Sequence, residues 1–108
     1  MDKREELNME LSDRIADVCQ VIVKNFSPQK VILYNIKTSA VGELRSFKLC
    51  VIVADGETLT IEKRIYLEVD SDIPFDVLVY TSEEWEKLIT QKNSFACRII
   101  KEGTYIHG

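Results

Sequence analysis

The stretch Phe47-Lys48-Leu49-Cys50-Val51-Ile52-Val53 decides the fold of this chain. It is almost entirely apolar and rich in β-branched residues, which is typical of a strand in the core of a sheet. Ala54-Asp55-Gly56-Glu57 follows and predicts the turn that ends this strand. The rest of the chain must therefore supply the neighbouring strands and the helices that cover them.

Two similar runs flank this central strand in the chain. Lys30-Val31-Ile32-Leu33-Tyr34 precedes it, and Phe75-Asp76-Val77-Leu78-Val79-Tyr80-Thr81 comes later, after a polar turn at residues 70–74. Both runs predict core strands. Residues 35–46 lose the pattern and contain Gly42, which predicts a loop before the central strand.

A long amphipathic helix is predicted at the N-terminus. Its apolar residues recur at spacings of four, four, three, four and four, which keeps them on one face of a helix. They are Leu7, Leu11, Ile15, Val18, Ile22 and Phe26. Ser27-Pro28 ends the helix, because proline has no amide hydrogen and restricts the residue before it. Residues 58–69 carry both helical and strand signals, and a helix is favoured there.

Two short helices and an edge strand are predicted at the C-terminal end. Ser82, followed by acidic residues, is typical of a helix N-cap, and Trp85 is expected to pack against the sheet. Asn93-Ser94 begins a second helix with Gly103 as its C-terminal cap. Its inner face is expected to carry Phe95, Ile99 and Ile100. Residues 104–107 are expected to add a brief edge strand.

Helices that alternate with strands over 108 residues predict a single domain, residues 1–108, of the α/β or α+β class. We expect two layers, with helices packed on a small mixed sheet. Cys19, Cys50 and Cys97 are widely spaced among apolar residues, which predicts free buried thiols and neither a disulfide nor a zinc site.

The charge balance argues against several classes of function. The chain has 14 basic and 18 acidic side chains, a net charge of -4, and no basic run longer than Lys63-Arg64. This composition disfavours binding to nucleic acid or to an anionic membrane. No apolar stretch approaches the roughly 18 residues that span a bilayer, and residues 1–6 are too charged for a signal peptide. We therefore expect a cytoplasmic protein.

Three segments carry a family resemblance. They are residues 26–34, residues 73–86 (Ile-Pro-Phe-Asp-Val-Leu-Val-Tyr-Thr-Ser-Glu-Glu-Trp-Glu), and residues 94–103 leading into Tyr105. Together they resemble the small prokaryotic nucleotidyltransferases of the polymerase-beta superfamily, of the minimal nucleotidyltransferase or antitoxin type. The resemblance covers almost the whole chain and implies a nucleotidyltransferase-like two-layer fold.

The chain departs from this family where the family's chemistry lies. Active members carry Gly-Ser after the first strand, Asp-x-Asp on the second and a third acid on a later strand, and the acids bind two divalent ions that promote phosphoryl transfer. Here the Gly-Ser pair falls at Asn35 and Ile36, and the acidic pair falls at Phe47 and Leu49. Only the third acid remains, as Asp76. The resemblance therefore implies a degenerate site without catalytic residues or cofactor.

The leading hypothesis is a protein-interaction module. Phe47 and Leu49 are expected to replace a charged cleft with an apolar surface that a partner covers. The resemblance implies that the partner is an all-helical HEPN protein, as in two-component toxin–antitoxin systems. Formation of a homodimer stays open.

The alternative hypothesis is a Mg²⁺-dependent nucleotidyltransferase that moves a nucleoside monophosphate from ATP to a protein or small-molecule acceptor. Its metal-binding acids would be Asp70, Asp72 and Asp76, the one plausible cation cluster in the sequence. A solvated turn competes with this interpretation, because Asp is common where side chains bond to turn amides.

A third hypothesis is nucleotide or phosphate binding without metal. Lys37, Thr38 and Ser39, with Asn35 beside them, are the residues expected to hold the anion. Lys37, with Arg45 and Lys48, could also bind an anion, and a solvated basic rim is the competing interpretation for these three residues.

Overall fold

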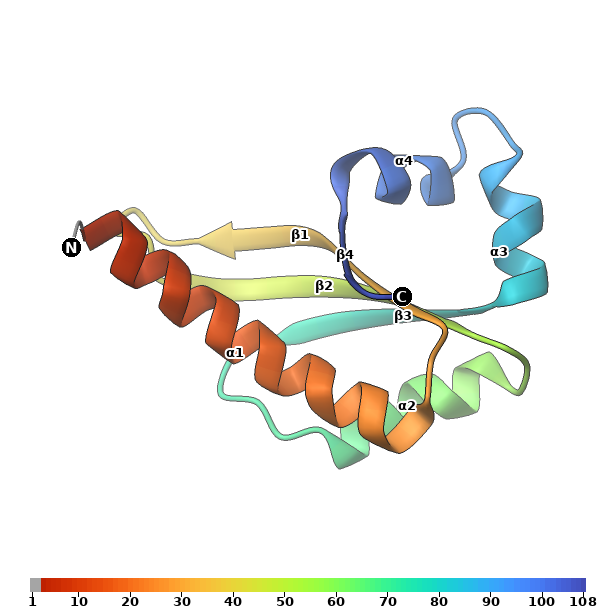
Figure 1. Cartoon of the computed structure of the whole chain (residues 1–108), viewed down its shortest axis with the longest axis horizontal. Coiled ribbons are helices and arrows are strands. Elements are labelled where there is room, and N and C mark those ends of the chain that lie inside the picture. The colour runs from red at the N-terminus through yellow and green to blue at the C-terminus, as the bar shows by residue number, and fades with distance from the viewer. Residues whose placement is uncertain (1–2) are drawn as a thin grey trace.

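The computed structural model describes residues 3–108, with side chains described from Asp13 onward. It is a four-stranded sheet with helices on both faces (Figure 1). The elements in chain order are α1 (Lys3–Phe26), β1 (Lys30–Thr38), β2 (Leu44–Val53), α2 (Thr58–Glu68), β3 (Phe75–Thr81), α3 (Ser82–Ile89), α4 (Phe95–Glu102) and β4 (Thr104–His107). The expected mixed α/β class, with helices packed on a small mixed sheet, is confirmed. The helices lie on both faces, so the fold has three layers and not the two expected.

The sheet is mixed, with the strand order β3-β2-β1-β4. β1 and β2 form an antiparallel hairpin, and β4 pairs antiparallel with the other side of β1. β3 is parallel to β2, because the chain crosses between them through α2. β2, predicted as a core strand, lies inside the sheet and is buried without interruption from Leu49 to Val53.

Successive side chains of β2 point to opposite faces of the sheet and so contribute to two cores, one on each face. Leu49 and Val51 lie in the larger core, which α1 and α2 cover with residues such as Ile22. Cys50 and Ile52 lie in the smaller core, beneath α3 and α4. Figure 1 shows these two pairs of helices on opposite sides of the strands.

α1 follows the predicted apolar stripe. Ile15, Val18 and Ile22 are buried, whereas the side chains of Leu7 and Leu11 lie outside the described residues. The helix ends where predicted, at Phe26, and Ser27 takes a φ of 46° before Pro28. α2 confirms the helix favoured for residues 58–69.

The predicted loop at residues 35–46 is wrong, because this segment is mostly strand. β1 continues to Thr38, the turn spans residues 39–43, and β2 begins at Leu44. The Ser39 N–H donates to the Glu43 carbonyl at 2.8 Å, and Gly42 takes a φ of 85° in the turn. Residues 35–38 are exposed, so they lack the apolar run that marks the buried strands.

Two predictions about the last helices need correction: the N-cap of α3 and the inner face of α4. The N-cap of α3 is Thr81 and not Ser82, with a capping box that Glu84 completes. Phe95 is 48% exposed and not inward, and Ile100 is 36% exposed, while Ile99 is buried as expected. The C-cap at Gly103 and the edge strand at residues 104–107 are confirmed.

Candidate functional site

The two faces of the sheet separate positions that the family resemblance would bring together. Phe47 and Leu49 are 1% and 0% exposed in the larger core, so the chain's own helices cover them and leave no surface for a partner. β2 and β3 pair with Lys48 beside Asp76 and Leu49 beside Val77. Because side chains alternate along a strand, Asp76 lies with Lys48 on the face opposite Phe47 and Leu49. This register does not assemble the three positions into one site.

The residues expected to bind a phosphate are divided between the two faces and the turn. They are Asn35, Lys37, Thr38 and Ser39. Asn35 pairs with Lys48 and Lys37 with Ser46, so both lie on the face that α3 and α4 partly cover. Thr38 pairs with Leu44, which belongs to the larger core on the other face. The Ser39 hydroxyl accepts a hydrogen bond from the Glu43 N–H at 3.1 Å and so helps to close the turn.

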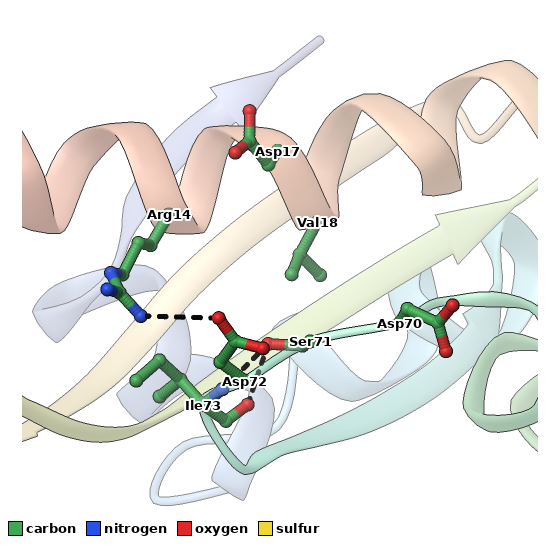
Figure 2. Close-up of a pocket in the computed structure, with 7 residues that line it drawn as sticks. All are labelled: Arg14, Asp17, Val18, Asp70, Ser71, Asp72 and Ile73. Atoms are coloured by element: carbon green, nitrogen blue, oxygen red, sulfur yellow. Dashed lines mark hydrogen bonds and ion pairs between the residues drawn. The ribbon is translucent and has the colours of Figure 1, made fainter.

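The acids expected to hold a cation are also kept apart. Asp70 and Asp72 line a cavity of about 370 Å³ between α1 and the loop before β3, with Arg14, Asp17, Val18, Ser71 and Ile73. Arg14 approaches Asp72 to 3.9 Å, while Asp17 and Asp70 point away from this pair (Figure 2). Asp76 lies on β3 and does not line the cavity.

This cavity has the features of a solvated turn. The side chain of Asp72 is 92% exposed. The Ser71 hydroxyl accepts from the Ile73 N–H at 3.1 Å and donates to the Ile73 carbonyl at 2.8 Å, so it serves the local backbone. Among the side chains described from residue 13 onward, no three His, Cys, Asp or Glu groups could hold a metal ion together. The expected Asp70, Asp72 and Asp76 cluster is therefore not assembled.

α3 and α4 cover only part of their face of the sheet. Ile52 and Cys50 are sealed in the smaller core with Trp85 and Ile99, but Asn35 and Lys37 on the same face are exposed. Tyr34 packs partly against this core, and its ring meets Phe95 edge to face at 5.8 Å between centroids. Burial raises the pKa of Tyr34 to about 12, with smaller contributions led by Cys50 and including Asp76, so its hydroxyl is neutral at physiological pH.

β1 is longer than the strand that covers its outer edge. β4 pairs with β1 only at Val31, Ile32 and Leu33, whereas β1 continues to Thr38. Within residues 3–108, no strand lies beside residues 35–38 on the side away from β2. In Figure 1, β4 lies beside the earlier part of β1 and not beside its arrowhead. Sequence reasoning missed this edge because it assigned the segment to a loop, although the alternation of Ile36 with polar neighbours was a signal for a strand.

The outer edge of β3, by contrast, is closed by side chains. The Val77 N–H donates to the Tyr66 hydroxyl at 2.8 Å, and the Thr81 N–H donates to Glu84 Oε1 at 3.1 Å. The Tyr66 ring also stacks on Phe75, with 5.7 Å between centroids. Edge strands that are protected in this way do not readily pair with another chain.

The exposed apolar side chains come from two groups of elements. Among the described side chains, nine large hydrophobic residues are exposed, and three of them are on α2: Leu59, Tyr66 and Leu67. The other six come from β1, its turn, α4 and β4, and we call this set the β1–β4 edge. It consists of Ile36, Val41, Phe95, Ile100, Tyr105 and Ile106.

No family model matches this chain, and no curated protein or solved structure is significantly similar to it. In the part of the chain that the structure describes, no helix is both long enough and apolar enough to cross a membrane.

Proposed function

We propose that this chain is a protein-interaction module that does not transfer nucleotides. The observation that carries the proposal is the β1–β4 edge, where six of the nine exposed large hydrophobic side chains belong to neighbouring elements. Single exposed apolar residues are ordinary, so the proposal depends on where these six lie: on β1, its turn and the two elements next to it, of which β1 has an open outer edge.

The placement of the former catalytic positions supports the second half of the proposal. Two-metal phosphoryl transfer needs several carboxylates directed at the same point. Phe47 and Leu49 are core residues here, and Asp76 faces the opposite side of the sheet beside Lys48. The proposals that the module is a degenerate relative of the nucleotidyltransferases and that its partner is a cytoplasmic HEPN-type helical protein rest on the sequence resemblance alone.

Binding is tested by co-expressing the chain with a HEPN-type helical protein from the same genome and measuring the mass of the purified complex by light scattering. We expect one stable complex. Val41→Ser, at a position 70% exposed on the β1–β4 edge, should weaken it severalfold. Leu67→Ser, at a position 83% exposed on α2, is the matched control and should leave it unchanged. The opposite order of effects would contradict the proposed surface.

The absence of nucleotide chemistry is tested by thermal unfolding with and without saturating Mg²⁺ and ATP. We expect no change in Tm. A ligand at 100 times its Kd would add about 2.7 kcal/mol and raise Tm by roughly 10 °C in a domain of this size. A rise of that size that disappears in chelator would overturn the proposal in favour of a Mg²⁺-dependent nucleotidyltransferase.

A further inference from the structure

The open half of β1 directs hydrogen-bonding groups outward. Ser39 donates its N–H to the Glu43 carbonyl across the hairpin and so directs its backbone groups toward β2. The register shift between Lys37 and Thr38 leaves the extra residue, Arg45, on β2, so the alternation along β1 continues and Lys37 also faces β2. Ile36 and Thr38 then direct their N–H and C=O groups to the other side, where no strand lies within residues 3–108. Ile36 and Thr38 each present one donor and one acceptor on this exposed edge, and the two residues are about 7 Å apart along the strand.

We infer that the outer edge of residues 35–38 is a docking site for one extended segment of a partner protein, which adds a strand to the sheet in line with β4. The site ends at Leu33, where Thr104 of β4 pairs, and at the turn that contains Val41. This inference rests on the proposed function, because it specifies how the module would hold its partner. Strand addition of this kind obtains affinity from the backbone and specificity from alternate side chains.

The side chains along the edge define the chemistry of that segment. Ile36, which is 45% exposed, pairs with Phe47 and so lies on the face of the larger core. Lys37 lies on the other face beside Ser46, and no ion pair among the described side chains involves it. Lys48 on that face has Asp76 beside it in register. An added strand would place an apolar side chain beside Ile36 on one face and a carboxylate beside Lys37 on the other. Because side chains alternate between the two faces, the docked segment alternates apolar and acidic residues.

The same charges disfavour a second copy as the occupant. If two copies paired symmetrically through residues 35–38, the Lys37 side chains of the two copies would lie close to each other. Like charges on neighbouring strands are destabilising. The other edges are less open. On β3, the Val77 N–H already donates to the Tyr66 hydroxyl. β4 is only four residues long, and its pairing with β1 contains a register shift.

The probe is a capped peptide, Thr-Val-Glu-Val-Glu-Val-Thr, with a control in which both Glu are replaced by Lys. Binding is followed through the amide resonances of the full chain by nuclear magnetic resonance. The Glu peptide should shift the amides of Ile36 and Thr38 and slow their hydrogen exchange at least tenfold, and the Lys peptide should bind more weakly. Shifts confined to α2 or to β4, or no shifts at millimolar peptide, would overturn the inference.

Two variants separate the backbone from the charge. Ile36→Pro removes an N–H that the alternation along β1 directs away from β2, and it should weaken peptide binding about tenfold. Lys37→Glu reverses one exposed charge without touching a core residue, so it keeps the fold and should weaken binding about threefold. Lys63→Glu, an exposed position on α2, is the charge-matched control and should bind as the parent does. Equal effects of Lys37→Glu and Lys63→Glu would contradict the assigned position.

The same variants distinguish a failure of this inference from a failure of the proposed function. If the helical partner binds Ile36→Pro and Lys37→Glu as tightly as the parent, the docking edge is wrong and the interaction module stands. If Mg²⁺ and ATP stabilise the chain, the proposed function fails irrespective of the peptide result. If the parent is a dimer and Ile36→Pro is a monomer, the edge pairs with a second copy and the inferred occupant is wrong.

Discussion

Gly103 shows at the scale of one residue how the C-terminal helix is fixed to the sheet. A Cβ atom at this position would lie 2.5 Å from the Ile99 carbonyl oxygen and 2.7 Å from Ile32 Cγ2. Its φ of -87° is open to any residue, so the requirement for glycine is one of space and not of backbone conformation. The close approach lets the chain pass directly from α4 into β4 beside Leu33.

Gly103→Ala should therefore destabilise the protein by about 1–3 kcal/mol, as overpacking usually does. The measurement is urea unfolding followed by circular dichroism. Glu102→Ala, at the exposed neighbouring position, should stay within about 0.5 kcal/mol of the parent. Equal midpoints for the two variants would show that α4 can shift to make room.

The start of α3 shows, at the scale of an element, how a strand becomes a helix without a loop. Thr81 ends β3 and also caps α3: its hydroxyl accepts from the Glu84 N–H at 3.2 Å, and its own N–H donates to the Glu84 carboxylate. Ser82, which the sequence suggested as the cap, instead makes a long contact of 3.4 Å to the Ala54 carbonyl. The cap lies one residue earlier than predicted because the last residue of β3 serves as the cap itself.

Thr81→Ala should cost about 1 kcal/mol of stability, the usual value for an N-cap. Ser82→Ala should cost less, since its hydrogen bond is long and exposed. Chemical denaturation gives both values, and hydrogen exchange at the Glu84 amide localises the effect to the helix end. A larger loss for Ser82→Ala would be inconsistent with this capping geometry.

The three thiols report, at the scale of the whole molecule, on each face of the sheet. Cys19 lies in the larger core and Cys50 in the smaller one, while Cys97 is half-buried on α4. Burial raises the pKa of Cys19 to about 11 and that of Cys50 to about 12. Because the thiolate is the reactive form, both core thiols are protected by burial and by protonation.

At pH 8 a maleimide should label Cys97 first, and Cys19 and Cys50 only when the molecule opens, as read by mass spectrometry of digested protein. Raising the pH should also weaken the fold. The two buried thiols contribute stability that is complete below their unfolded pKa near 9 and is lost as the pH rises through 11 and 12. Labelling of Cys50 as fast as Cys97 would mean that the smaller core does not stay closed.

Much of the architecture of the whole molecule was predictable from local patterns. The apolar runs gave β2 and β3, the stripe through Ile15 and Ile22 gave α1, and Ser27-Pro28 gave its end, because these signals are repeated over many residues and reflect burial. The strand at residues 35–38 was not predicted, since an edge strand with exposed side chains has no apolar run. The predicted site residues are not brought together, because the face of the sheet and the strand register decide which side chains lie near one another.

The sequence by itself determined which segments are helix or buried strand, and that Phe47 and Leu49 belong to such a strand. The tertiary structure alone decided that these two residues are sealed beneath the chain's own helices, that Asp76 faces the other side of the sheet, and that β1 outruns β4. The physical reason is that periodicity encodes burial locally, whereas strand pairing depends on contacts between distant segments. Whether a strand edge is open therefore depends on how all the other strands of the sheet pair.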